Sequence, residues 1–158
     1  MQKLTAALAG RWAIRQTFEA SDTMPNGSVG QGTEVWRPGP GARSLVEDIH
    51  TRVGDREFSG LGVVWWDGQA QGFRVMWCGS ANPRGCVVMS KLASWEDGQF
   101  VVRDEFERDG RKIVYREIFS DITPGSFTQT IYQGVPGGEL KRTLTIHATR
   151  IAAGQPAE

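Results

Sequence analysis

The sequence of 158 residues has little of several features that mark common classes of protein. Its 18 basic and 18 acidic residues cancel, and it has no extended basic run, which excludes the electrostatic footprint of a nucleic-acid-binding protein. No apolar run approaches the roughly 20 residues that span a bilayer, so we expect no membrane partner. The apolar part of residues 2–9 is too short for a signal peptide, and we therefore expect a cytoplasmic protein.

Cysteine and histidine are scarce as well. The two cysteines, Cys78 and Cys86, flank a predicted loop and could form a disulfide across the mouth of a hairpin. For a cytoplasmic protein we expect two reduced thiols, with the disulfide as the alternative. Two cysteines and two histidines without close pairing do not make a zinc-site pattern, so we expect no metal site and no cofactor.

Glycine, by contrast, is abundant, with 20 residues that fit many turns and close backbone approaches. Residues 2–8 predict a short helical turn with Leu4, Ala7 and Leu8 on one face. About ten short extended runs follow at intervals of roughly 8–14 residues, and turn signals separate them. These runs are 10–20, 29–37, 42–52, 56–66, 71–78, 86–96, 99–108, 111–120, 126–134 and 139–151.

The connections between these runs are short, so neighbouring strands should be antiparallel. Closing such a sheet removes its exposed edges. The sequence therefore predicts an all-β fold, a ten-stranded antiparallel up-and-down barrel after a short N-terminal helical turn. We expect a single domain over 1–158, with the barrel at about 10–151 and a flexible C-terminal tail at 152–158.

Three Asp-Gly pairs predict two-residue hairpin turns, which set the strand registers and hence the two faces. A turn at Asp109-Gly110 pairs Asp104 with Tyr115 and places Phe106 and Glu117 on the same inward face. A turn at Asp97-Gly98 places Trp95 and Lys91 on that face, with Lys91 opposite Asp104. Because buried charges must be paired, we expect an ion pair between these two.

The remaining hairpins complete the predicted interior. A two-residue turn at Asp67-Gly68 places Trp66 and Trp77 inside and Trp65 outside. A Gly137-Gly138 turn places Gln129 and Arg142 inside. The turn after the second strand can be built in several ways. A four-residue loop there groups five residues on one face, namely Glu34, Trp36, Leu45, Glu47 and Ile49.

Gly10-Arg11-Trp12 at the start of the first strand resembles the Gly-x-Trp signature of the lipocalin and fatty-acid-binding (calycin) group. Residues 35–47, 60–62, 66–67 and 73–77 also resemble a bacterial family of small lipocalin-like proteins, a domain of unknown function. The resemblance covers most of residues 8–151 and implies a ten-stranded barrel with a central cavity. It implies no catalytic residues.

His147 invites comparison with a second calycin-like group, the haem-binding nitrobindin-type barrels, which use a histidine near the C-terminus as iron ligand. The first strand lacks the repeated glycines expected there after Trp12. The predicted register also turns His147 outward, so we do not expect haem. His50 alternates with the inward set and is expected at the surface or rim.

These residues favour non-enzymatic binding of a small, mostly hydrophobic ligand in the barrel cavity. The predicted ligand-binding residues are Trp36, Trp66, Trp77, Lys91, Trp95, Asp104, Phe106, Tyr115, Glu117, Gln129 and Arg142. One alternative is a barrel enzyme, an isomerase or hydrolase, with Asp104 or Glu117 as base. Another is a filled barrel that dimerises through outward apolar residues, namely Leu61, Val63, Trp65, Val101 and Ile118.

Overall fold

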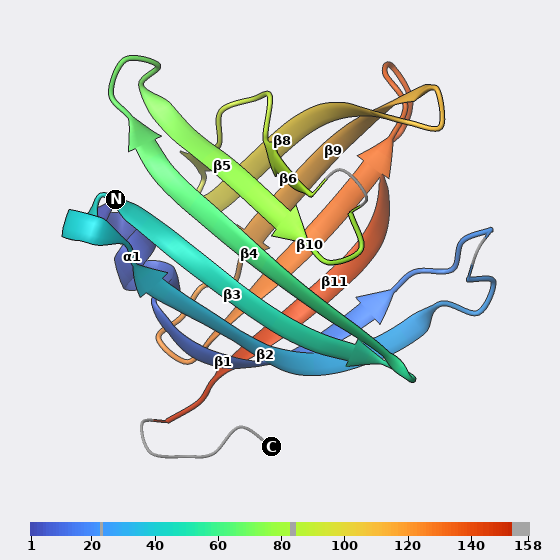
Figure 1. Ribbon diagram of the computed structural model, residues 1–158, viewed down its shortest axis with the longest axis horizontal. Coiled ribbons are helices and arrows are strands. Elements are labelled where there is room, and N and C mark those ends of the chain that lie inside the picture. The colour runs from blue at the N-terminus through green and yellow to red at the C-terminus, as the bar shows by residue number, and fades with distance from the viewer. Residues whose placement is uncertain (23, 83–84, 153–158) are drawn as a thin grey trace.

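The structure of the protein is a computed structural model, which describes residues 1–22, 24–82 and 85–152 (Figure 1). The predicted N-terminal helical turn is present as α1. The elements are α1 (Gln2–Leu8), β1 (Gly10–Phe18), β2 (Ser28–Pro38), a 3-10 turn (Pro40–Ala42), β3 (Ser44–Val53), β4 (Arg56–Asp67), β5 (Gly72–Gly79), β6 (Cys86–Val88), β7 (Ser94–Glu96), β8 (Gln99–Arg108), β9 (Arg111–Ser120), β10 (Ser126–Gly134) and β11 (Lys141–Arg150). Most of the predicted tail at 152–158 lies outside the described residues.

The strands form one curled antiparallel sheet in the order β6-β5-β4-β3-β2-β1-β11-β10-β9-β8-β7 (Figure 1). The all-β prediction is confirmed. The count is eleven strands, not ten, and the sheet is an open half-barrel rather than a closed barrel. The predicted run 86–96 is two short strands at opposite edges of the sheet, because the chain crosses from one edge to the other between them.

The crossing segment, residues 89–93, is tied to both edges. The backbone N–H of Met89 donates to the carbonyl of Val75 at 2.8 Å, and Phe73 and Ala93 exchange two backbone hydrogen bonds of 3.1 and 2.8 Å. On the other side, Ser90 donates to Asp104 on β8 through both its backbone N–H and its hydroxyl, each at 2.7 Å. Backbone and side-chain hydrogen bonds of the crossing segment therefore bridge the two edges, although no continuous ladder joins them.

Two of the predicted hairpin registers are confirmed. Asp97 and Asp109 adopt φ values of 47° and 52°, and the glycine after each also has a positive φ, as a two-residue turn of this type requires. Asp104 accordingly lies opposite Tyr115.

The turn at Asp67 is longer than predicted, since Asp67 pairs with Gly72. The Asp67 carboxylate accepts hydrogen bonds from the backbone N–H groups of Gln69 and Ala70, both at 3.0 Å, which stabilise the wider turn. The inward face is unchanged, because the register shifts by an even number of residues.

The last hairpin corrects the placement of Arg142. A β-bulge follows Ile131, so Ile131 pairs with Leu144 but the next residue, Tyr132, pairs with Arg142. One extra residue on a strand turns the following side chains to the other face. Arg142 is therefore exposed, and its Nε donates to Glu19 at 2.7 Å.

The helix α1 covers one end of the curled sheet. Leu4 and Leu8 are fully buried, and the indole Nε1 of Trp12 donates to the carbonyl of Leu8 at 2.8 Å. Lys3, also on α1, places its Nζ 4.1 Å from the ring centroid of Trp95 on β7. The helix α1 therefore contacts the first strand through Trp12 and the edge strand β7 through Trp95.

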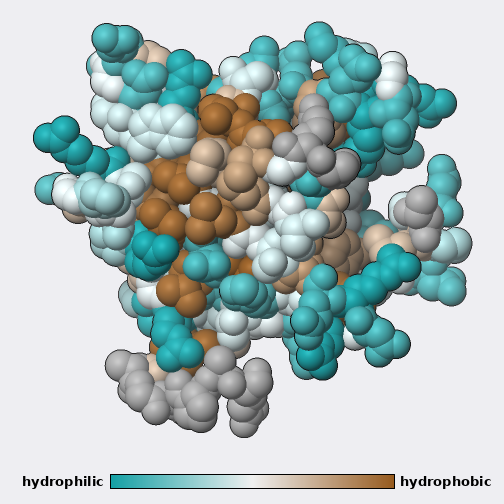
Figure 2. Space-filling model, viewed as in Figure 1, coloured by the Kyte–Doolittle hydropathy of each residue, from teal (hydrophilic) through white to brown (hydrophobic). Residues whose placement is uncertain are grey.

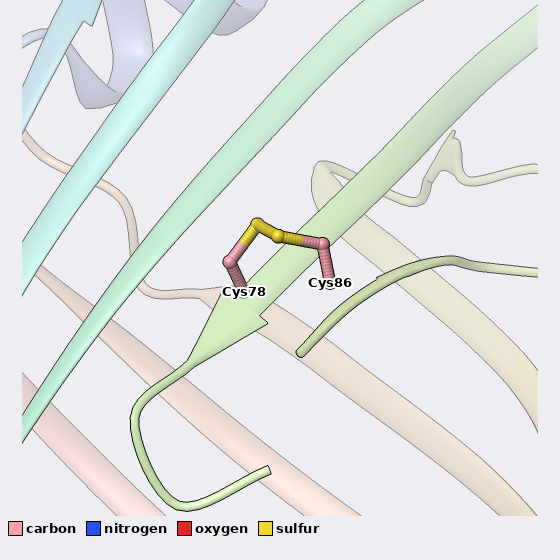
Figure 3. Close-up of a disulfide and its surroundings, with 2 residues drawn as sticks. All are labelled: Cys78 and Cys86. Atoms are coloured by element: carbon pink, nitrogen blue, oxygen red, sulfur yellow. A yellow bond between two sulfur atoms is a disulfide. The ribbon is translucent and has the colours of Figure 1, made fainter. Parts of the chain in front are cut away.

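Cys78 on β5 and Cys86 on β6 form a disulfide, which corrects the expectation of two reduced thiols (Figure 3). The residues lie directly opposite each other in the β5–β6 ladder, with Cα atoms 4.0 Å apart. The hairpin itself brings the two sulfur atoms together. The described residues include no helix that is long and apolar enough to cross a membrane.

Candidate binding site

Three glutamates from three strands converge inside the curled sheet: Glu34 on β2, Glu47 on β3 and Glu117 on β9. Their exposed fractions are 0%, 5% and 9%. Strand alternation places each on the inward face, since Glu34 pairs with Ile49 and Glu47 with Trp36. We call these three side chains, together with Tyr115 and Gln129, the carboxyl cluster.

Three side chains donate hydrogen bonds within or onto the carboxyl cluster. The hydroxyl of Tyr115 donates to Glu117 Oε2 at 3.0 Å, and Gln129 Nε2 donates to Glu117 Oε1. The indole Nε1 of Trp36 donates to Glu34 Oε1. Glu117 is therefore held by donors on both oxygens, whereas Glu34 is held on one oxygen only.

Several buried oxygen atoms of the cluster have no donor among the described residues. They are Glu34 Oε2, Glu47 Oε1 and Gln129 Oε1. A fourth such acceptor, Gln16 Oε1, lies on the neighbouring strand β1. An unsatisfied buried polar atom costs about 1–3 kcal/mol, more when it is charged. These oxygens are hydrogen-bonding groups that the described residues leave without a partner.

Burial dominates the electrostatics of the cluster. It raises the pKa of Glu34 from 4.5 to about 7, opposed by the hydrogen bond from Trp36 and reinforced by the charge of Glu117. Burial also raises the pKa of Glu47 well above its usual value, with further increases from the Glu34 and Glu117 charges. Burial raises the pKa of Glu117, although the hydrogen bonds from Gln129 and Tyr115 lower it. Near neutral pH the cluster therefore retains protons.

Aromatic rings fill the interior between the cluster and α1. Trp36 on β2 contacts Phe119 on β9 edge-to-face, with centroids 6.0 Å apart. Phe119 in turn contacts Phe127 at 6.0 Å, and Phe127 contacts Trp12 at 4.8 Å. These contacts cross the sheet from wall to wall, so the α1 end is a packed core. Trp36 and Phe119 are its rings beside the carboxyl cluster.

A cleft of about 430 Å³ lies over β2, β3 and β4. Gly32, Thr51 and Phe58 contribute to it, but most of its lining residues belong to the outer surface or rim, namely Gln31, His50, Arg52, Glu57, Ser59 and Ser80. Glu34 is the next inward residue after Gly32, roughly 7 Å further along the strand. The lining includes no residue of the carboxyl cluster, so the cleft is a feature of the surface over these strands.

Four of the predicted binding residues belong to this region, namely Trp36, Tyr115, Glu117 and Gln129. Trp77 and Phe106 are half-buried: Trp77 stacks on Phe58 with centroids 6.3 Å apart, and the guanidinium of Arg108 lies 5.3 Å from the Phe106 ring. Trp95 is at the α1 end beside Lys3. Trp66 is 43% exposed and contacts Phe73 edge-to-face.

The expected ion pair between Lys91 and Asp104 is wrong. The Lys91 side chain is 51% exposed, and its Nζ lies 3.4 Å from Glu105. Lys91 lies in the crossing segment, which has left the β7–β8 ladder, so the register that placed it opposite Asp104 no longer applies. Asp104 is buried and instead accepts the two hydrogen bonds from Ser90 that anchor the crossing segment.

Glu34 and Glu47 are the site residues that sequence reasoning missed. The four-residue turn grouped them correctly with Trp36, but their strand pair had no Asp-Gly turn to set its register. A signal was present in the pattern itself, since Glu34 and Trp36 are alternate residues of one strand and so share a face. Inward carboxyls on two neighbouring strands, Glu34 on β2 and Glu47 on β3, are unusual among large apolar residues on a buried face.

The histidines lie away from the cluster. His147 is exposed, as predicted, and its Nδ1 lies 3.3 Å from the hydroxyl of Thr128 on the outer surface. His50 is exposed too and lies 3.6 Å from Asp48. Within the described ranges, no group of three or more His, Cys, Asp or Glu side chains is arranged to hold a metal ion.

No family model and no curated protein matches the chain. Among solved structures, it is similar to the structure of EF1p2_mFAP2b bound to DFHBI, with a TM-score of 0.50 and 13% sequence identity. The similarity covers 93% of this chain and 98% of that chain. At this identity the likeness concerns the fold alone, a curled antiparallel sheet.

Proposed function

We propose that the protein binds a small, mostly apolar ligand with one or two polar groups inside the curled sheet. The observation that carries this proposal is the set of buried acceptors, Glu34 Oε2, Glu47 Oε1 and Gln129 Oε1, that lack a donor among the described residues. The neighbouring rings of Trp36 and Phe119 offer an apolar wall. The fold shared with a solved protein bound to DFHBI supports the same reading.

Binding can be tested by intrinsic tryptophan fluorescence in a screen of small aromatic and aliphatic compounds. We expect a bound compound to quench Trp36, the indole nearest the cluster, and to raise the melting temperature. A ligand at 100 times its Kd adds about 2.7 kcal/mol to the free energy of unfolding. A panel that leaves both signals unchanged contradicts the proposal. Trp36→Phe, checked by melting, should remove the quenching, whereas Trp66→Phe should retain it.

The alternative of a barrel enzyme stays a prediction. Asp104 is engaged by Ser90, and Glu117 by Tyr115 and Gln129, so each candidate base already accepts two hydrogen bonds. Asp104→Asn and Glu117→Gln remain the variants that test it, and any turnover that survives both contradicts a role as base.

Self-association is a second candidate role, favoured by the outer face of β3–β6. The register there aligns Val46, Val63, Met76 and Val88 in one row across four strands. Figure 2 shows hydrophobic side chains gathered over β3–β5 on this face. Arg37 pairs with Val46 at the border of the row, and Asp48 lies on the same face. A border with both signs of charge suits an isologous contact between two copies of the chain.

The cytoplasmic location stays a prediction, and the disulfide favours an oxidising compartment instead. Thiol labelling of the protein taken directly from its native cells distinguishes the two. Labelling of both Cys78 and Cys86 without prior reduction would support the cytoplasm.

A further inference from the structure

We propose that the ligand of the carboxyl cluster is an amphipathic organic cation, a primary or secondary ammonium group on an aromatic or aliphatic body. This inference rests on the proposed binding function and specifies the polar end of the ligand. It follows from the charge, the hydrogen-bonding capacity and the apolar wall of the site.

The charge of the interior is one-sided. Glu34, Glu47 and Glu117 meet there, and none of the salt bridges formed among the described residues includes any of them. The two cations that the sequence placed inside, Lys91 and Arg142, are at the surface with Glu105 and Glu19. Without a cation these buried carboxyls retain protons rather than carry charge, and a ligand with a positive charge would supply the partner that stabilises their ionised form.

The hydrogen-bonding capacity points the same way. The unpaired atoms of the cluster are all oxygens. Two belong to the carboxyls of Glu34 and Glu47, which accept when they are ionised, and the third, Gln129 Oε1, belongs to a neutral amide that is 5% exposed and can only accept. Gln129 uses its Nε2 to donate to Glu117, which leaves its oxygen without a partner. An ammonium offers two or three N–H donors and no acceptor, whereas a ligand carboxylate would add acceptors and repulsion.

The apolar wall explains why the cation should carry an organic body. The rings of Trp36 and Phe119 lie beside the carboxyls, and aromatic faces attract cations and pack against apolar groups. A bare inorganic ion would use neither property. A metal ion is disfavoured besides, since the described carboxyls are not arranged as a metal site.

The test compares three ligands that share one body: 1-naphthylmethylamine, 1-naphthalenemethanol and 1-naphthoate. Each is titrated into the full chain by calorimetry at pH 8, where the amine is protonated and Glu34 is largely ionised. We expect the amine to bind roughly tenfold more tightly than the alcohol, because charge-assisted hydrogen bonds are about twice as strong as neutral ones. The carboxylate should bind most weakly.

The outcomes separate the two proposals. If the alcohol or the carboxylate binds as tightly as the amine, the ligand class is wrong while the binding function stands. If none of the three binds, both proposals are overturned. Because these titrations use the native chain, the result does not depend on the folding of any variant.

Variants then locate the contact. Glu34→Gln and Glu47→Gln should each weaken amine binding roughly tenfold and change alcohol binding by less than about twofold. Glu139→Gln, at an exposed carboxylate away from the cluster, is the matched control and should change neither. An equal loss for amine and alcohol in the interior variants would contradict recognition of the ammonium by these carboxylates.

Discussion

Glu34 combines full burial with a donor for only one of its two oxygens. An ordinary surface glutamate is solvated on both oxygens and ionises near pH 4.5. Inside the sheet, loss of water disfavours the charged form more than the Trp36 hydrogen bond favours it. Glu47 has the same character, and Gly62 provides the room for it: a Cβ at that glycine would lie 2.5 Å from Glu47 Oε2.

The raised pKa of Glu34 predicts that stability falls as pH rises. Below pH 4.5 the carboxyl is protonated in the folded and unfolded chains, and its contribution is fully present. The contribution is lost as pH rises toward the folded pKa of about 7. A shift of this size corresponds to about 3 kcal/mol. Glu47 and Glu117, whose pKa values are also raised, add a loss of the same sign.

Urea unfolding at pH 4.5 and pH 8 measures this loss. In Glu34→Gln the amide cannot ionise, so the difference between the two pH values should shrink by about 3 kcal/mol. Glu57→Gln should keep the wild-type difference. A wild-type chain that is equally stable at both pH values would contradict the prediction.

At the scale of elements, the short strand β6 depends on one covalent link. Its ladder with β5 covers three residue pairs, and the Cys78–Cys86 disulfide joins one of them. The crossing segment that follows carries Ser90, which holds Asp104 on the opposite edge. The disulfide therefore anchors the N-terminal side of the connection between the two sheet edges.

Replacing both cysteines, as Cys78→Ser with Cys86→Ser, should lower the free energy of unfolding by about 2 kcal/mol, since a short loop is no longer cross-linked in the unfolded chain. Hydrogen exchange should also increase at Met89 and Ala93, whose backbone N–H groups bond to β5. Thermal melting with and without dithiothreitol measures the effect. The double variant must be insensitive to dithiothreitol, and unchanged melting of the wild type under reduction would contradict the role of the disulfide.

At the scale of the whole molecule, the sheet has one end closed by α1 and an apolar outer face. The aromatic core and α1 occupy the closed end, and the row from Val46 to Val88 marks the outer face. An inner site and an outer contact face can act independently, because adjacent residues of a strand point to opposite faces.

Val63→Lys places a charge in the middle of the outer row and should reduce self-association without altering ligand binding. Sedimentation equilibrium at several concentrations gives the mass of each species. Thr145→Lys, on the outer face of β11, serves as the control and should associate as the wild type does. A wild type that stays monomeric at the highest concentration would contradict the contact.

The sequence by itself determined the class of fold, the helical turn at 2–8, and the faces of most strands. Turn chemistry and alternation are local, so Asp97-Gly98 and Asp109-Gly110 specify their hairpins without help from distant residues. Even the longer turn after Asp67 left the predicted faces intact, because the register changed by an even number.

Only the tertiary structure decided the composition of the interior site. Glu34 and Glu47 come from the consecutive strands β2 and β3, and the curl of the sheet brings Glu117 to them from β9, far along the chain. The crossing segment moved Lys91 out of the interior, and a single bulge moved Arg142 out. The crossing segment and the bulge both interrupt the two-residue alternation of side chains along a strand. The alternation pattern in the sequence therefore does not predict them. They leave three buried carboxyls without a cation, which is the property on which the proposed charge of the ligand depends.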